Sequence, residues 1–395
     1  MDHFLPGTAA GGPVGSIRNF TLALRNYYDI EIVTRDCEFR SHERYSPEAM
    51  EAVRAELGVP IHYLRADNSL LVSLARVLRA KRDTTSVVYL NSFFARKFSH
   101  FPQILLRTLG YKGRIVVATR GELTQGALSI KKRRKALFLQ LGNRLGWFTN
   151  LQFHASTEIE KAEILRVLPG ADVAVARVIP TESAAPDARR EATTWPSREV
   201  LQIALISRIA PVKNHRFLID LMREVPGRVH LVFAGTMDVI PYWDDCRRSL
   251  ALLPSRVTWE YVGLVSPQER LTLLESSHIF ALPTLGESYG HAIAEALDAG
   301  CPTLISDRTP WHGLAEAGVG ADLPLADPAR WVKVITDIRD MSDDDYFAMR
   351  ERARTFRERI FPPEVAIAEN RALFDRAIEA ADPHLNPAFP EGAAS

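Results

Sequence analysis

Cysteine, long apolar runs and net charge are all scarce in this sequence. Its three cysteines (Cys37, Cys246 and Cys301) are scattered without the spacing of a metal site, and their odd number indicates free thiols in a reducing compartment. No apolar run reaches the roughly 20 residues needed to cross a bilayer, and no signal peptide opens the chain. A net charge of +1 provides no general attraction for nucleic acid. We therefore expect a cytoplasmic protein with no nucleic-acid partner.

Two motifs of nucleotide sites are also missing. No G-x-G-x-x-G follows a strand-like run, which argues against a NAD-dependent dehydrogenase. No Asp-x-Asp with a strand and turn around it is present to hold a divalent ion, so we expect no metal site and no cofactor. Glycines at 7, 11, 12 and 15 let a loop approach a ligand with its NH groups facing a phosphate, or form only a flexible N-terminal turn.

The length and the pattern of the chain predict two α/β domains. A chain of 395 residues is long for one core, and strand-like runs alternate with helical runs in both halves. A stretch rich in proline and alanine separates the halves. We place the N-terminal domain at 1–180, the linker at 181–199, the C-terminal domain at 200–362, a last helix at 363–382 and a loose tail at 383–395.

The most informative stretch runs from His278 to Asp307. It reads as a buried strand, a turn, an alanine-rich helix from His291 and a second strand, which together form a βαβ unit. The backbone NH groups at the helix start, from Ser288 to His291, suit an anion, because they are unsatisfied and lie at the positive end of the helix dipole. Glu287 in the turn cannot itself bind that anion, so we expect it to hold hydroxyl groups beside a phosphate. Glu295 falls inside the helix.

Polar residues follow two predicted strands of the N-terminal half. The strand at 86–91 ends in Asn91, and the strand at 114–123 carries Arg120 and Glu122 at its C-terminal end. The carboxyl ends of parallel strands face ligand crevices, so these three residues are candidates for the acceptor side. Arg120 offers a planar fork for a phosphate or carboxylate, or it forms a salt bridge with Glu122 or another acid. His154 is a lone histidine among apolar residues, and we expect it to be structural.

A basic run, Lys131 to Lys135, precedes an apolar helical pattern that contains Leu137, Phe138, Leu141, Leu145 and Trp147. This pattern is typical of a helix that lies on a membrane surface or grips a phosphate. A solvated basic turn before a helix that faces the core is the alternative.

The stretch Glu287-Ser-Tyr-Gly-His-Ala-Ile-Ala-Glu295, with its continuation AlaLeuAspAlaGlyCysPro, resembles the E-x7-E motif of retaining glycosyltransferases of family 4, the glycosyl transferases group 1. The segments ThrArgGlyGluLeu and PheHisAlaSerThrGluIleGluLys resemble members that build polysaccharides. The resemblance covers nearly the whole chain and is strongest over 200–310. It implies the GT-B fold, two Rossmann-like domains facing a central cleft, with a last helix that crosses back to the first domain.

The resemblance also implies roles for particular residues. Glu287 would contact the donor sugar, Glu295 would hold the ribose, and Arg208 with Lys213 would hold the pyrophosphate and stabilise the leaving group. The remaining donor-binding residues would be Gly11, Gly12, Gly263, Leu264, Ser288, Tyr289, Gly290 and His291. Many family members carry a histidine that touches the donor sugar where this chain has Thr119, Arg120 and Gly121, so no catalytic histidine is carried over.

We therefore expect a metal-independent, retaining glycosyltransferase that uses a UDP- or GDP-sugar. Its acceptor would be a glycan or a lipid-linked glycan in exopolysaccharide, capsule or lipopolysaccharide assembly. Peripheral contact through Lys131–Lys135 would place it at the inner face of the membrane. A GT-B nucleotide-sugar epimerase or hydrolase is the alternative, since it would share the fold and the nucleotide site. The nucleobase, the sugar and the acceptor stay open.

Overall fold

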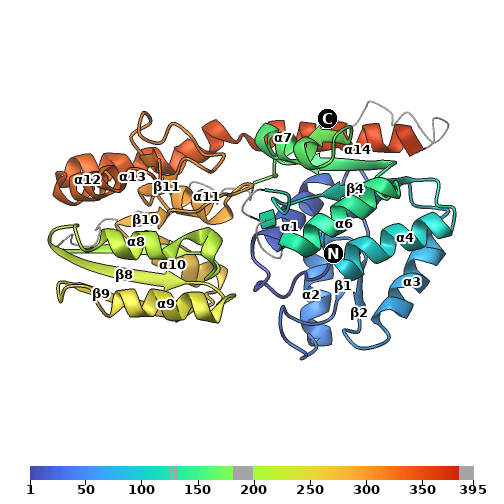
Figure 1. Cartoon of the computed structure of the whole chain (residues 1–395), viewed down its shortest axis with the longest axis horizontal. Helices are drawn as coiled ribbons and strands as arrows, with labels where there is room; N and C mark the ends of the chain where they lie inside the picture. The colour runs from blue at the N-terminus through green and yellow to red at the C-terminus, as the bar shows by residue number, and fades with distance from the viewer. Residues whose placement is uncertain (125–126, 129–131, 181–198, 382–395) are drawn as a thin grey trace. The chain divides into compact units, whose positions relative to one another are not determined.

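The computed structural model describes residues 1–124, 127–128, 132–180 and 199–381, which form two compact units (Figure 1). One unit comprises Met1–Ile179 with the chain from Glu364 onward, and the other comprises Pro180–Pro363. Each unit is built on parallel strands connected by helices, as the alternating pattern predicts. The predicted linker, apart from residue 199, and the predicted tail lie outside the described residues.

The C-terminal unit contains a six-stranded parallel sheet in the order β12-β11-β10-β7-β8-β9. Numbered along the chain within the unit, this is the order 3-2-1-4-5-6 of a doubly wound nucleotide-binding fold, read from the other edge. Strand β10 is buried at all four of its residues, because helices cover both faces of a parallel sheet. The strands are β7 (Val200–Ile206), β8 (Arg228–Ala234), β9 (Val257–Gly263), β10 (Ile279–Leu282), β11 (Thr303–Ser306) and β12 (Gly320–Leu323).

Two helices of this unit begin at clear local capping signals. Helix α10 has Ser266 as its N-cap with a full capping box to Glu269, and α13 is capped by Ser342 with three aspartates in its first turn. The helical elements are η3 (Pro211–Lys213), α8 (His215–Leu221), α9 (Ile240–Leu250), α10 (Pro267–Ser276), α11 (His291–Asp298), α12 (Pro328–Asp340) and α13 (Asp343–Ile360).

The N-terminal unit contains a four-stranded parallel sheet and a separate parallel pair. The sheet has the order β3-β4-β5-β6, and its strands are β3 (Val87–Leu90), β4 (Arg114–Ala118), β5 (Leu151–Ala155) and β6 (Asp172–Val175). The pair consists of β1 (Ile32–Arg35) and β2 (Ile61–Leu64). The helices are α1 (Gly12–Leu24), α2 (Pro47–Leu57), α3 (Leu70–Lys81), η1 (Arg96–His100), α4 (Phe101–Thr108), α6 (Lys132–Arg144), α7 (Glu158–Val167) and α14 (Pro363–Ala381).

Helix α14, the last element in the described part of the chain, packs in the N-terminal unit. Its Leu373, Phe374 and Ala377 form one apolar cluster with Val116 of β4 and Ala176. The contact is also polar, because Arg177 forms an ion pair of 2.7 Å with Glu369, and Gln152 Nε2 donates to the carbonyl of Leu373. The core of this unit is therefore closed by the end of the chain.

The N-terminal glycines differ from the loop that the sequence predicts. Helix α1 begins at Gly12, because Gly11 takes a left-handed φ of 74° as its N-cap and Pro13 sits in its first turn. Gly12 and Gly15 are therefore helical.

Candidate functional site

The site predicted from the sequence converges on the middle of the C-terminal sheet. Strands β7 and β10 are neighbours, and the chain runs from them toward opposite edges of the sheet. Ligands of doubly wound sheets bind at such a switch point, beyond the carboxyl ends of the two strands. The loop after β7 carries Arg208 and Lys213, and the loop after β10 carries Glu287, so residues about 80 positions apart in the chain meet there.

Lys213 and Glu287 form an ion pair through Nζ and Oε1, and their side chains are only 14% and 12% exposed. The two loops are held together by Val212, whose carbonyl accepts hydrogen bonds from Leu285 N at 2.7 Å and from Thr284 Oγ1 at 3.1 Å. This contact places a cation and a carboxylate side by side at the mouth of the switch point. Such a pair can hold a phosphate and a hydroxyl group at adjacent positions.

Arg208 is held differently from Lys213. Its Nη1 donates to Asp238 Oδ2 at 2.6 Å, and the carboxylate is 8% exposed whereas the arginine is 49% exposed. The loop that carries Asp238, after β8, is tied to the loop after β7 because Ile209 N donates to the carbonyl of Thr236 at 2.7 Å. Sequence reasoning missed Asp238. The available signal was an acid a few residues beyond the end of a strand that neighbours β7.

The start of α11 has the predicted helix-start geometry. Gly290 takes a left-handed φ of 85° as the N-cap, and as a glycine it has no side chain with which to cap the first turn. Ser288 and His291 are partly buried at this turn. Tyr289 is buried in the core, against the rings of His291, Trp311 and Phe361, and Trp311 Nε1 donates to its carbonyl. The buried Tyr289 side chain therefore anchors the turn to the core of the unit.

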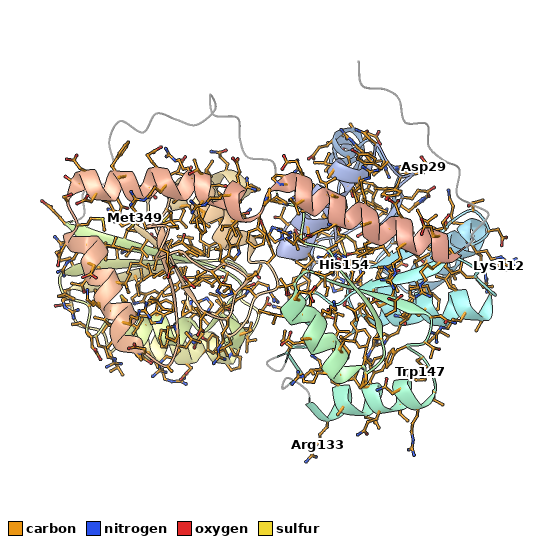
Figure 2. The ribbon with its side chains drawn as sticks, turned by 90° about the horizontal axis from the view of Figure 1, so that it is seen from above. Asp29, Lys112, Arg133, Trp147, His154 and Met349 are labelled. Carbon is orange, nitrogen blue, oxygen red and sulfur yellow. The ribbon has the colours of Figure 1, made fainter. Side chains whose placement is uncertain are left out.

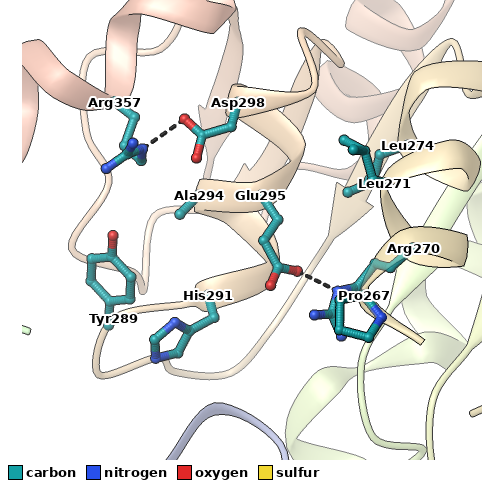
Figure 3. A pocket seen from close by; sticks show the side chains of 10 residues that line it. All are labelled: Pro267, Arg270, Leu271, Leu274, Tyr289, His291, Ala294, Glu295, Asp298 and Arg357. Carbon is teal, nitrogen blue, oxygen red and sulfur yellow. Dashed lines mark hydrogen bonds and ion pairs between the residues drawn. The ribbon is translucent and has the colours of Figure 1, made fainter. Parts of the chain in front are cut away.

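Glu295 lines a cavity of about 200 Å³ between α10 and α11 (Figure 3). Its Oε2 forms an ion pair of 2.7 Å with Arg270 Nε, and Figure 3 shows the two side chains meeting across the cavity. Burial raises the pKa of Glu295, and the neighbouring Arg270 opposes that shift. Deeper along α11, Asp298 forms an ion pair of 2.6 Å with Arg357. Arg270 is a second residue that the sequence did not single out.

Two further donor-binding candidates, Gly263 and Leu264, lie at the carboxyl end of β9. Gly263 has a left-handed φ of 76°, its carbonyl accepts from Gly235 N at 2.7 Å, and Leu264 is exposed. Sequence reasoning also missed His215 at the start of α8. It is fully buried, with Nε2 at 3.3 Å from Ser207 Oγ, and burial together with the charge of Lys213 lowers its pKa to about 3.

In the N-terminal unit Arg120 contacts Asn91, whereas Glu122 has other hydrogen-bond partners. Arg120 Nε donates to Asn91 Oδ1 at 2.7 Å. The carboxylate of Glu122 instead accepts from Ser92 Oγ, Phe93 N and Phe94 N at 2.7–2.9 Å. Glu122 thus caps the turn after β3. Its oxygens are used by these donors, so the structure gives no support to the alternative in which Arg120 forms a salt bridge with Glu122.

The glycine loop near the N-terminus also departs from its prediction. Thr8 N and Ala9 N both donate to Glu38 Oε2, at 2.8 and 3.3 Å, so these NH groups are taken by the protein's own carboxylate. Gly11 N donates to the carbonyl of Thr8. The predicted contact of Gly11 and Gly12 with the donor stays a prediction.

The basic run divides into two kinds of residue. Lys131 lies outside the described residues, and Lys135 turns inward, where Nζ donates to the carbonyl of Ala127 and lies 4.6 Å from the ring centre of Phe94. Arg133 and Arg134 are exposed, and Figure 2 shows Arg133 pointing away from the unit. Phe138 packs in the core, whereas the other apolar residues of the pattern are exposed: Leu137 (57%), Leu141 (43%), Leu145 (62%) and Trp147 (39%).

Two further features of the structure concern metal ions and membranes. Within the described residues, no group of three or more histidine, cysteine, aspartate or glutamate side chains is placed to hold a metal ion. In the same part of the chain, no helix has the length and apolar character of a membrane span.

Part of the chain is similar to known glycosyltransferases. Residues 201–340 match the family model described as glycosyl transferases group 1. A putative glycosyltransferase, EpsF of Bacillus subtilis (strain 168), is 29% identical over 140 residues, which is 34% of this chain and 35% of the relative. The match thus spans about a third of the relative's length.

Two solved structures resemble nearly the whole chain. Sucrose-phosphate synthase from Thermosynechococcus elongatus gives a TM-score of 0.67 at 16% identity and covers 94% of each chain. HepE of Anabaena, solved in complex with UDP-glucose, gives 0.64 at 14% identity and covers 94% of this chain and 98% of its own. At such low identity the likeness establishes the fold, which is the α/β fold with parallel sheets of GT-B glycosyltransferases.

Proposed function

We propose that this protein is a glycosyltransferase that moves a sugar from a nucleotide-sugar donor to a glycan or a lipid-linked acceptor. The observation that carries the proposal is the Lys213–Glu287 pair at the switch point of the C-terminal sheet, with Arg208 on the adjoining loop. The match of residues 201–340 to glycosyl transferases group 1 supports it, since this range contains all three residues.

The chemistry follows from the charge that a transfer reaction creates. When the bond between the sugar and the diphosphate breaks, negative charge develops on the leaving diphosphate, and fixed cations lower the barrier by stabilising it. Lys213 and Arg208 would supply that stabilisation, together with the NH groups at the start of α11. A resident metal ion is not required by this scheme. Glu287, released from Lys213 by the phosphate, would accept hydrogen bonds from sugar hydroxyls.

We propose retention of the anomeric configuration, which rests on the resemblance to the E-x7-E family. No described residue near Lys213 and Glu287 is a convincing covalent nucleophile, so departure and attack would take place on one face of the sugar. Glu295 would hold the ribose, and the loop at Gly263 and Leu264 would receive the base. The HepE complex with UDP-glucose favours a uridine nucleotide over a guanosine nucleotide.

We further propose that the acceptor is presented at a membrane surface on the cytoplasmic side, for assembly of an extracellular polysaccharide. The support is α6, where Arg133 and Arg134 are exposed near Leu137 and Leu141 of the same helix, and Leu145 is exposed directly after the helix ends. Exposed leucines with neighbouring arginines suit an anionic lipid surface. EpsF is named as a putative glycosyltransferase and the Thermosynechococcus elongatus structure as a synthase, and these names give the epimerase or hydrolase alternative no support.

A ligand screen followed by a transfer assay tests the function. UDP at 100-fold its dissociation constant should stabilise the protein by about 2.7 kcal/mol in thermal unfolding, and GDP should do so less. Radiolabelled UDP-sugars should then label an extractable lipid-linked acceptor. Conversion of the free UDP-sugar without label transfer would contradict the proposal in favour of the alternative.

A further inference from the structure

The N-terminal unit holds one arginine in an unusual environment at the carboxyl edge of its sheet. Arg120 follows β4 by two residues and adopts a left-handed φ of 49°, which residues other than glycine rarely take. Such strain persists where surrounding contacts impose it, and it is often found at functional sites. The side chain is partly buried and partly accessible.

A directional chain of hydrogen bonds fixes this side chain. Arg120 Nη2 donates to the hydroxyl of Tyr89 at 3.1 Å, and that hydroxyl lies 2.7 Å from His154 Nδ1. His154 Nε2 lies 2.8 Å from the carbonyl of Ala176, which can only accept, so Nε2 carries the proton and Nδ1 accepts from Tyr89. His154 lies inside the unit (Figure 2), and burial lowers its pKa to about 4. The chain therefore contains only neutral groups beyond Arg120.

Asn91 also holds Arg120, although this leaves one polar atom of Asn91 without a hydrogen bond to any described residue. Its Oδ1 accepts from Arg120 Nε at 2.7 Å, but its amide nitrogen is buried without a hydrogen-bond partner in the described part of the chain. An unsatisfied buried donor is rare and calls for an explanation. Orientation of Arg120 by the carbonyl oxygen provides one.

No described carboxylate pairs with Arg120, although acids lie close by. Glu122 is bound to the turn after β3. The buried carboxylate of Glu160 accepts from Thr119 Oγ1, Gly121 N, Ser156 N and Ser156 Oγ at 2.6–2.7 Å. By contrast, Arg114 at the other end of the same strand forms an ion pair of 2.7 Å with Asp172. A rigid, accessible cation without a carboxylate partner is suited to bind an external oxyanion in a planar, two-pronged contact.

We propose that Arg120, oriented by Asn91 and Tyr89, binds a carboxylate or phosphate of a substrate. This inference rests on the proposed function, because the oxyanion would belong either to the donor sugar or to the acceptor. An acidic sugar such as a uronate would supply it in the first case, and a lipid-linked phosphate in the second. Arg120 makes the contact, and Asn91 is a positioning residue.

The test compares charged and neutral probes with the full chain. Affinities are measured for UDP-glucuronate against UDP-glucose in the donor arm, and for geranyl diphosphate against geraniol, with UDP present, in the acceptor arm. Wild-type protein should prefer the charged member of one pair by about tenfold or more. The arm in which the preference appears identifies the source of the oxyanion.

Two variants and a control make the test specific. Arg120→Gln should abolish the preference by removing the cation, and Asn91→Asp should abolish it by placing a carboxylate against the retained arginine. Arg114→Gln removes a cation from the same strand and should leave the preference intact. Equal affinity for both members in both arms, or a preference that survives in Arg120→Gln and Asn91→Asp, would overturn the inference. Failure of wild-type protein to bind UDP or GDP at all would contradict the proposed function instead, and the geranyl pair would still decide the role of Arg120.

Discussion

The candidate site residues of the two units hold their cations in different ways. In the C-terminal unit each basic residue at the candidate nucleotide site already has an acidic partner: Lys213 has Glu287, Arg208 has Asp238 and Arg270 has Glu295. In the N-terminal unit Arg120 is held by an amide and a phenol. A ligand phosphate must therefore compete with carboxylates in the first unit, whereas at Arg120 it meets an uncompensated charge. The comparison suggests that the first arrangement is built to exchange partners during a reaction and the second to recognise a fixed group.

The largest effect is expected when the cation of the Lys213–Glu287 pair is removed. Lys213→Ala should lower turnover by about 10²-fold or more, because a preorganised donor to the leaving group is lost. Steady-state kinetics with a UDP-sugar would measure it. Lys333→Ala, which breaks an exposed pair with Asp337 on α12, serves as the control and should have no effect. Normal turnover with a raised Michaelis constant would mean that Lys213 binds the ground state and the transition state equally.

A smaller effect is expected from a change in the Arg270–Glu295 pair. Glu295→Gln should weaken the binding of UDP by about 1–3 kcal/mol, since a charge-assisted hydrogen bond to the ribose is replaced by a neutral one. Isothermal titration with UDP measures the loss, and Glu316→Gln on the exposed surface provides the control. A folded Glu295→Gln protein with unchanged affinity would remove Glu295 from the nucleotide site.

The buried histidines permit a comparison of the two units by pH. His215 and His154 have pKa values lowered to about 3 and about 4, so between those values and about 6.5 the unfolded chain binds protons that the folded chain does not. Stability should therefore fall as the pH falls through this window, by about 1.4 kcal/mol per pH unit for each histidine. His215→Gln should make the fall shallower in the C-terminal unit alone, and His154→Gln in the N-terminal unit alone. Hydrogen exchange of each sheet between pH 6.5 and 4.5 measures the slopes, and unchanged slopes would contradict the assignment.

The smallest effect concerns the exposed arginines of α6. Arg133→Gln with Arg134→Gln should weaken binding to anionic vesicles by about 1 kcal/mol per cation, and added salt should weaken the binding of the parent protein. Vesicle sedimentation measures it. Arg247→Gln with Arg248→Gln, two neighbouring exposed arginines on α9 of the other unit, is the matched control. A double variant of α6 that sediments as well as the parent would show that the basic run is an ordinary solvated segment.

Much of the fold could be predicted because its signals are local. Buried strands, the Ser266 cap of α10 and the turn before α11 depend on residues within a few positions of one another. Glu287 and Lys213 could be singled out because both follow strand ends. Their direct contact could be expected only from the resemblance, since it depends on β7 lying beside β10.

Asp238 and Arg270, which sequence reasoning missed, are ion-pair partners of the predicted site residues and belong to no sequence motif. Asp238 lies 30 positions from Arg208, and Arg270 lies 25 positions before Glu295, with no local pattern to connect them. Glu122 was assigned to the acceptor side because it follows a strand end. Its oxygens instead satisfy NH groups of the neighbouring turn, and that choice depends on register between β3 and β4.

The position of α14 has a consequence for how the protein is made. The C-terminal unit is continuous in sequence and can fold as soon as the ribosome has released it, whereas the N-terminal unit lacks Leu373, Phe374 and Ala377 until α14 has been synthesised. Until then the apolar face around Val116 and Ala176 is left uncovered, so the unit synthesised first is the one finished last. A stop codon before α14 would therefore release a chain whose C-terminal unit is intact and whose N-terminal unit exposes that face to aggregation.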